Sequence, residues 1–273
     1  LIILNSSYSI ANGFDMDKYL SNSIIKDFSV ADAAYYNIYK CYGGEQTLSK
    51  EFLMELYSYN GIKETGNIFF KEFDYFVDST IKNAVNKAIK EFNMSEQKAE
   101  IFKNEIKQKK LTVQYYGLDS SILDELNYFQ GNPDKEKFMS GKYIIANAFD
   151  SSGKVPYYNI GDKVTIDYPN GTGKEYEVMA IANIPYPISY RGVKFVDINF
   201  YVPSKEFINN IDDIAPMLTT FDVSPESAME IENFLSNYCN NINKDMQYAS
   251  KLTFAKEFEG LKNTYLSVGI ELG

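Results

Sequence analysis

The sequence predicts an α+β fold: a ferredoxin-like, porter-type sheet-and-helix subdomain that carries an inserted small β-rich subdomain and a helical excursion. The first subdomain is indicated by a strand–helix–strand pattern near the start of the chain, which recurs near its end. Apolar segments of strand length between the two units predict the β-rich subdomain, and a charged helical stretch predicts the excursion. At 273 residues and 45% hydrophobic, the chain can bury a core of this size.

The first strand–helix–strand unit spans residues 27–76. "DFSVADAAYYNIY" (27–39) is alternating or fully apolar and predicts a strand, and "GNIFFKEFDYF" (66–76) predicts a second one. Between them, "LSKEFLMELYSYNG" (48–61) has the signals of a helix. Ser49 can cap its start, and Gly61 can end it in a left-handed conformation.

Residues 80–110 predict the excursion, a pair of charged helices. The second helix begins after Ser95, which can cap it. The first helix has an apolar stripe made of Ile81, Ala84, Val85, Ala88, Ile89 and Phe92. A charged helical hairpin of this kind is typical of a solvated projection from a main core.

The segment "LTVQYYGLDSSILDEL" (111–126) predicts a strand that runs through a sharp junction into a helix. It does not match the nucleophile elbow Gly-x-Ser-x-Gly, because Asp119 stands at the nucleophile position and the second glycine is missing. Ser121 and Asp124 instead fit the start of a helix. Its apolar residues at helical spacing are Ile122, Leu126 and Phe129. We therefore interpret the junction as scaffold.

Residues 141–203 are rich in predicted strands. "DKVTIDY" and "KEYEVMAIANI" flank the turn sequence "PNGTG", which predicts a β-hairpin over 162–182. The turn does not form a phosphate-binding P-loop, because Tyr168 replaces the first glycine of that motif and Glu175 replaces its Ser/Thr.

The second strand–helix–strand unit lies near the end of the chain. "MLTTFDV" (217–223) and "MQYASKL" (246–252) predict strands around a helix at 224–239. Ser224 would cap this helix, and Pro225 would take its first position. Its buried stripe would consist of Ala228, Ile231, Leu235 and Tyr238. Together the two units can form one four-stranded sheet with both helices on one face.

Composition excludes several classes of function. The formal net charge is −10 and Arg191 is the only arginine, which argues against binding to nucleic acid. The chain has no histidine, so it has no Ser-His-Asp or Cys-His catalytic group and no His-ligated zinc. Two cysteines, Cys41 and Cys239, cannot form a four-thiolate site, and we expect them not to pair with each other.

The chain has no recognisable catalytic motif. Its 37 acidic residues include several neighbouring pairs, but sequence neighbours do not define the two facing carboxylates that a glycosidase needs. None of the acids follows the Asp-x-Asp-x-Asp-Gly pattern of a calcium loop. We therefore expect no catalytic residue, no metal site and no cofactor.

The best candidate for ligand contact is the loop "NIPYPISYRG" (183–192). Two prolines stiffen it, and it carries the only arginine of the chain. Tyrosine offers an apolar ring with a polar tip, and arginine offers forked donors, so both suit a binding loop. The candidate ligand-binding residues are Tyr186, Tyr190 and Arg191.

The order of these segments resembles the extracytoplasmic domain of FtsX-like ABC transporter permeases, the MacB-like core domain. The resemblance rests on strand, helix and strand followed by "YYGLDSSILDELNYFQG", "GKYIIANAF", "GDKVTIDYPNGTGKEYEVMAIANIP" and "FYVPSKEF". "ANGFDMDKYLSN" (11–22) and "LKNTYLSVG" (261–269) are similar to the segments that leave one transmembrane helix and enter the next in such permeases. The helical excursion departs from the minimal pattern of the family.

The resemblance implies a non-catalytic domain on the extracellular side of the cell membrane. ATP hydrolysis in the cytoplasm would drive the movement of this domain. It implies a separate ATP-binding cassette subunit as partner, and it allows a permease dimer and a peptide or lipid ligand. The expected divisions are an N-terminal stalk helix at 1–26, a porter-like subdomain at 27–117 with 215–252, an inserted β-rich subdomain at 118–214 and a C-terminal stalk helix at 253–273.

Two other functions remain open from the sequence. A secreted or surface-anchored module would bind a peptide or glycan with its tyrosines, of which the chain has 23. A hydrolase would have to work with carboxylates and would need two acids that converge in one pocket. The permease interpretation instead expects apolar runs of about 20 residues just outside both ends of this sequence.

Overall fold

The computed structural model describes residues 26–32, 48–185, 188–190, 194–253, 255–256 and 259–260. The expected stalk segments 1–26 and 253–273 lie almost entirely outside the described residues, and so does Cys41. Within the described part of the chain, no helix has both the length and the apolar character required to cross a bilayer.

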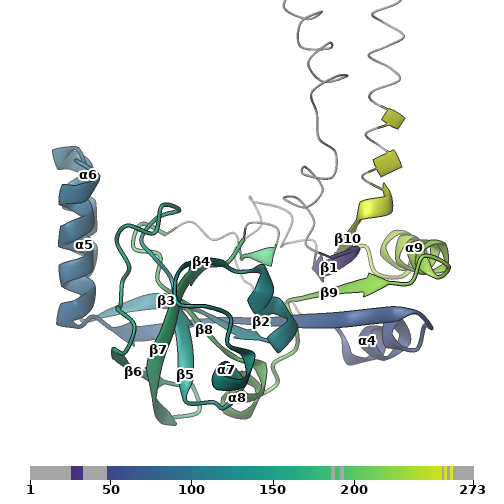
Figure 1. The fold of residues 1–273 in the computed structure, drawn as a ribbon, viewed down its shortest axis with the longest axis horizontal. Coiled ribbons are helices and arrows are strands. Elements are labelled where there is room, and N and C mark those ends of the chain that lie inside the picture. The colour runs from purple at the N-terminus through teal and green to yellow at the C-terminus, as the bar shows by residue number, and fades with distance from the viewer. Residues whose placement is uncertain are drawn as a thin grey trace, which may run out of the picture.

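One continuous mixed sheet of ten strands organises the described residues, in the order β10-β1-β9-β2-β3-β8-β5-β7-β4, with β6 paired to β7 (Figure 1). The strands are β1 (Phe28–Asp32), β2 (Ile62–Phe76), β3 (Lys110–Leu118), β4 (Asn127–Gln130), β5 (Tyr143–Ala146), β6 (Lys163–Asp167), β7 (Gly173–Asn183), β8 (Asn199–Pro203), β9 (Leu218–Val223) and β10 (Met246–Ser250). The helices are α4 (Lys50–Tyr57), α5 (Ser79–Glu91), α6 (Glu96–Ile106), α7 (Lys135–Met139), α8 (Ser204–Asn210) and α9 (Ala228–Asn237), with a 3-10 helix η1 (Ser120–Glu125) and a π-helical turn η3 (Tyr238–Ile242).

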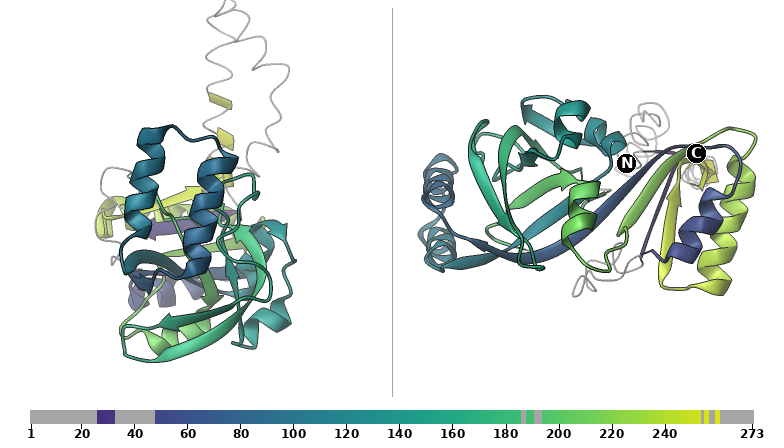
Figure 2. Two further views of the ribbon diagram at one scale, coloured as in Figure 1. Left: turned by 90° about the vertical axis from the view of Figure 1, so that its left-hand side faces the viewer. Right: turned by 90° about the horizontal axis from the view of Figure 1, so that it is seen from below.

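Four strands and two helices form the ferredoxin-like part. The strands lie in the order β10-β1-β9-β2, and each neighbouring pair is antiparallel. Helices α4 and α9 lie together against one face of these strands (Figure 2), where Phe52 of α4 and Leu235 of α9 share a core with Phe28 and Phe221. Ser49 caps α4 as predicted, because its side chain accepts a hydrogen bond from the Phe52 N–H. The predicted ferredoxin-like arrangement is confirmed.

The helical excursion is also confirmed. Helices α5 and α6 form a hairpin between β2 and β3, at the opposite end of the molecule from α4 and α9 (Figures 1 and 2). Asp78 caps α5 and Ser95 caps α6. The hairpin is anchored to the body because its apolar residues, among them Val85 and Phe102, join the same core as Tyr115 of β3.

The central strands are covered on both faces. Successive residues of a strand point to opposite faces, so Tyr115 and Tyr116 of β3 lie in two different hydrophobic cores. The predicted hairpin over 162–182 is present as β6 and β7, with Gly171 in a left-handed conformation (φ 84°) in its turn. Strand β3 pairs with β2 on one side and with β8 on the other, which joins the ferredoxin-like part to the inserted strands.

Two predicted helix starts are wrong. Ser121 does not begin a regular helix: η1 is a short 3-10 helix, and residues 127–130 form β4, which pairs with β7. The Ser121 hydroxyl instead donates to the Thr65 carbonyl oxygen (2.9 Å). Pairing with the sheet therefore overrides the helical spacing of Leu126 and Phe129.

Helix α9 begins at Ala228, three residues after Pro225. Ser227 takes the N-cap position, and the hydroxyl of Ser224 forms a hydrogen bond to that of Ser227 (3.1 Å) instead of capping the helix. Helix α4 ends at Tyr57, before Gly61, whose positive φ (86°) serves the turn into β2.

Candidate functional site

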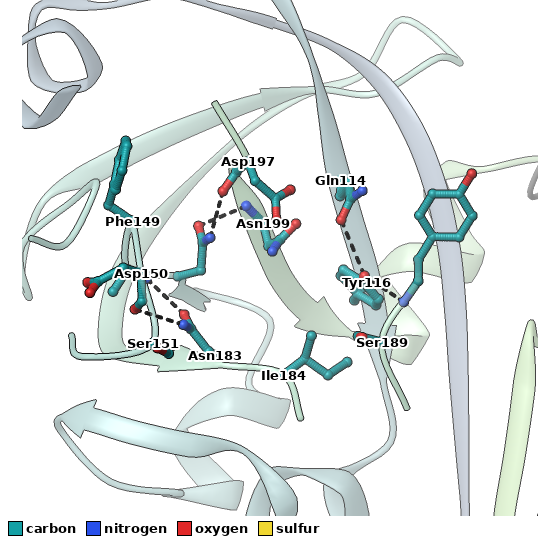
Figure 3. A pocket seen from close by; sticks show the side chains of 13 residues that line it. Gln114, Tyr116, Phe149, Asp150, Ser151, Asn183, Ile184, Ser189, Asp197 and Asn199 are labelled. Atoms are coloured by element: carbon teal, nitrogen blue, oxygen red, sulfur yellow. Dashed lines mark hydrogen bonds between the residues drawn. The ribbon is translucent and has the colours of Figure 1, made fainter. Parts of the chain in front are cut away.

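A pocket of about 270 Å³ lies where β3, β8 and the end of β7 meet the loop that follows β7 (Figure 3). Most of its side chains are polar, although the surrounding strands are apolar. It is lined by Gln114, Tyr116, Asn147, Ala148, Phe149, Asp150, Ser151, Asn183, Ile184, Ser189, Tyr190, Asp197 and Asn199.

A row of polar residues crosses the sheet at this pocket. Gln114 of β3 is in register with Glu72 of β2 on one side and with Asn199 of β8 on the other. Side chains in register on neighbouring strands point to the same face, so these three lie next to one another. Asn147 extends the row: its Oδ1 accepts from the Asn199 N–H (2.9 Å), and its Nδ2 donates to the Asp197 carbonyl oxygen (2.7 Å).

Two tyrosine hydroxyls hold the loop after β7 against the sheet. The N–H of Ile184 donates to the Tyr201 hydroxyl (3.0 Å), and the N–H of Tyr190 donates to the Tyr116 hydroxyl (3.0 Å). Tyr116 and Tyr201 are in register on β3 and β8, so Ile184 and Tyr190 of this loop are fixed to adjacent strands. The ring of Tyr190 stacks on Phe70, with ring centroids 4.2 Å apart.

Among the acids that line the pocket, Asp197 has a carboxyl group whose pKa is shifted. Burial raises the pKa of its carboxyl to about 6, and the charge of Glu72 adds to the rise, while Lys194 and the Asn199 amide act in the opposite direction. Lys194 forms its ion pair with Glu72 (2.9 Å) and also donates to the Thr112 carbonyl oxygen (2.8 Å). The carboxyl of Asp197 therefore changes its charge within the physiological pH range.

The sequence identified only part of this pocket. Of the three candidate ligand-binding residues, Tyr190 lines this pocket, whereas Tyr186 and Arg191 lie outside the described residues. Sequence reasoning missed Gln114, Asp197 and Asn199. A signal for them existed: each is a polar residue within or beside an otherwise apolar strand, in "LTVQYYGL" and "VDINFYVP".

The described residues do not form a recognisable catalytic or metal centre. Asp150 and Asp197 both line the pocket, but their carboxylates do not point toward each other (Figure 3). No group of three or more acidic or thiol side chains within the described ranges could hold a metal ion. Cys239 is a half-buried free thiol, and burial raises its pKa to about 11, which disfavours the reactive thiolate.

Comparisons with known proteins support the fold. The sequence matches no protein family model, and no curated protein is significantly similar to it. Among the similar solved structures is the periplasmic region of MacB from Actinobacillus actinomycetemcomitans, with a TM-score of 0.51 and 11% identity over 89% of this chain and 97% of that one. Another is the extracellular domain of the noncanonic ABC-type transporter YknZ from Gram-positive bacteria, with a TM-score of 0.40 and 13% identity over 82% of this chain and 99% of that one. The first comparison shows that this chain has the fold of the MacB periplasmic region.

Proposed function

We propose that this chain is the non-catalytic extracytoplasmic domain of an ABC transporter permease of the FtsX/MacB type, from a Gram-positive bacterium. It would couple ATP hydrolysis by a separate cytoplasmic subunit to movement outside the cell, for export or sensing of a peptide, lipid or lipoprotein. The fold shared with the MacB periplasmic region over nearly its full length supports this proposal.

The observation that carries the proposal is the pairing of β1 with β10. Phe28 is in register with Ser250, and the Lys251 N–H donates to the Asp27 carbonyl oxygen (3.0 Å). The chain therefore enters the sheet and leaves it at adjacent positions. Two neighbouring membrane helices would need this arrangement to act on the domain together.

The continuous sheet provides a route for such movement. A displacement of β1 and β10 would pass through β9 to β2, whose long ladder with β3 leads into the inserted strands. In this proposal the stalks are residues 1–26 and 253–273, the porter-like subdomain is 27–117 with 215–252, and the inserted subdomain is 118–214. A second copy of the permease is the proposed partner within the membrane.

The proposal predicts that the domain lies outside the cell, and thiol labelling of intact cells tests this location. Ser152 is exposed, so a Ser152→Cys variant of the intact parent protein, with Cys41, Cys239 and every other cysteine of the parent replaced by serine, offers a single accessible thiol. A membrane-impermeant maleimide should label it in intact cells. A cytoplasmic cysteine reporter should stay unlabelled until the cells are lysed. Labelling of Ser152→Cys only after lysis would rule out the extracellular location.

A surface-anchored or secreted binding module is the second candidate, and the polar pocket favours it. The parent sequence separates the two candidates: a permease requires apolar runs of about 20 residues immediately outside both ends of this sequence, whereas a module that is secreted or anchored at one end does not. A carboxylate-based hydrolase has less support, because the two pocket carboxylates do not point toward each other (Figure 3).

A further inference from the structure

Three buried polar atoms in one wall of the pocket have no hydrogen-bond partner. They are the Oδ1 atoms of Asp197 and Asn199 and the Nε2 atom of Gln114. Gln114 and Asn199 are only 2% and 7% exposed, so bulk water does not satisfy them. Native proteins seldom leave such groups unpaired, and a ligand that supplies the missing partners is one reason for exceptions.

These atoms lie close enough together to act on one ligand. Gln114 and Asn199 are in register on β3 and β8, and Asp197 lies two residues before Asn199 on the same strand segment. In Figure 3 the carboxylate of Asp197 lies beside the amide of Asn199, and the side chain of Gln114 stands next to them. The wall thus presents two acceptors and one donor.

The neighbouring charges leave the carboxylate of Asp197 available. The ammonium group of Lys194 is engaged by Glu72 (2.9 Å) and by the Thr112 carbonyl (2.8 Å). Both polar atoms of the Asn147 amide already have partners: Oδ1 accepts from the Asn199 N–H, and Nδ2 donates to the Asp197 carbonyl oxygen. A complementary ligand therefore needs a cationic donor for Asp197 and Asn199 and an acceptor for Gln114.

We propose that this pocket binds a small ligand through a primary ammonium group adjacent to a carbonyl oxygen, the chemistry shared by peptide amino termini and amino acid amides. The ammonium group would donate to Asp197 Oδ1 and Asn199 Oδ1, and the carbonyl oxygen would accept from Gln114 Nε2. Tyr190, stacked on Phe70, would form an apolar wall beside the ligand. This inference goes beyond the permease proposal, which assigns no ligand to this pocket.

The size of the pocket limits the ligand. Its volume of about 270 Å³ lies below the range of roughly 300–1,000 Å³ typical of sites for drug-sized molecules. An amino acid amide or the first residues of a peptide fit this space, with the rest of a peptide extending outward. A large apolar lipid does not fit it.

The test is isothermal titration calorimetry of the 273-residue chain with alaninamide and with trialanine, at neutral pH. Each is compared with its N-acetylated form, which keeps the carbonyl oxygen and loses the ammonium group. We expect saturable binding of at least one amino form and at least tenfold weaker binding after acetylation. Binding of alaninamide alone would identify a free amino acid derivative, and binding of trialanine would identify a peptide terminus.

Two matched variants test whether the ligand binds in this pocket. Asp197→Asn keeps the size of the side chain and removes its charge, so it should weaken binding of the amino ligand at least tenfold. Asp245→Asn makes the same change at an exposed position in the turn before β10 and should leave binding unchanged. No saturable binding of either amino ligand to the wild-type chain, or equal binding of the amino and acetylated forms, would overturn the proposal. Because this assay involves no ATPase and no membrane, its outcome is independent of the permease proposal.

Discussion

Buried tyrosine is the characteristic residue of this protein. Six tyrosines are among its largest fully buried side chains: Tyr115, Tyr116, Tyr157, Tyr158, Tyr176 and Tyr201. Several of their hydroxyls form hydrogen bonds inside the molecule. The hydroxyls of Tyr158 and Tyr75 form a hydrogen bond with each other (2.9 Å), and burial raises the pKa of Tyr75 to about 12. These phenols therefore remain neutral and act mainly as packing groups.

The carboxyl of Asp197 makes stability depend on pH. Its folded-state pKa of about 6 exceeds the value of about 3.9 expected in the unfolded chain. The folded state thus holds this proton more tightly, and the contribution of Asp197 to stability falls as pH rises from about 4 to about 6. Asp197→Asn removes this cost and should raise the free energy of unfolding at pH 7 by about 1–3 kcal/mol, since one pKa unit is worth about 1.4 kcal/mol.

Urea unfolding of Asp197→Asn and the wild type at pH 4.5 and pH 7 measures this effect. The difference between the two proteins should shrink at the lower pH. Asp245→Asn, at an exposed position, is the control and should match the wild type. A variant that is less stable than the wild type at pH 7 would contradict the expected cost of the buried carboxylate.

The two hydroxyls that hold the loop after β7 can be removed one at a time. Tyr116→Phe deprives the Tyr190 N–H of its acceptor, and Tyr201→Phe does the same for the Ile184 N–H. Each change should cost about 0.5–1.5 kcal/mol, because it removes one hydrogen bond of a partly buried N–H group. Hydrogen exchange measured by NMR should show faster exchange at Tyr190 in the first variant and at Ile184 in the second. Uniform acceleration across the loop in both variants would show that the two contacts are not separate.

At the scale of elements, the α5–α6 hairpin depends on two caps of unequal value. Asp78 accepts from the Ile81 N–H (2.8 Å) and also from the hydroxyl of Tyr158 (3.0 Å). Ser95 accepts only a longer bond from the Lys98 N–H (3.4 Å), at an exposed position. The first cap therefore ties the excursion to the main core, whereas the second serves α6 alone.

Replacing each cap by alanine should reveal this difference. We expect Asp78→Ala to lower the free energy of unfolding by about 2 kcal/mol and Ser95→Ala to lower it by about 0.5 kcal/mol, the upper and lower parts of the range for lost caps. Chemical unfolding followed by far-ultraviolet circular dichroism measures both. Asp78→Asn keeps an acceptor for the cap and should recover part of the loss. Equal costs for the two alanine variants would disprove the anchoring role of Asp78.

At the scale of the whole molecule, β3 joins the two halves, and α8 docks on it at Gly117. A Cβ atom at this glycine would lie 2.6 Å from the Cβ atom of Phe207 of α8, which is too close for any real contact. Gly117 is in register with Phe69 of β2 and Val202 of β8. The glycine of the junction thus serves close packing between a helix and the sheet.

Gly117→Ala should consequently destabilise the whole domain by about 1–3 kcal/mol, the usual cost of overpacking. Gly260→Ala is the matched control: a Cβ atom there meets nothing within 4 Å, and the residue is helical, so a gain of up to about 1 kcal/mol is expected. Urea unfolding should show a lower midpoint for Gly117→Ala with an unchanged slope. A changed slope would indicate that the two halves no longer unfold as one unit.

The sequence by itself determined the local elements of this protein. The alternation in "KVTID" and "KEYEV" around a glycine-containing turn is enough for the β6–β7 hairpin, because a hairpin needs only neighbouring residues. The caps at Ser49 and Ser95 could also be predicted from the sequence, since a cap is formed within one helical turn. The repeated strand–helix–strand pattern also predicted the ferredoxin-like part correctly.

Tertiary structure decided what depends on residues far apart in the chain. Residues 127–130 became a strand because β7 offered an edge for pairing, against their own helical spacing. The pocket exists because β3 and β8 pair in a register that sets Gln114 beside Asn199, 85 positions further along. Register between distant strands follows from packing on both faces of the sheet. A single sequence specifies the polar residues, but only the folded sheet brings them to one place.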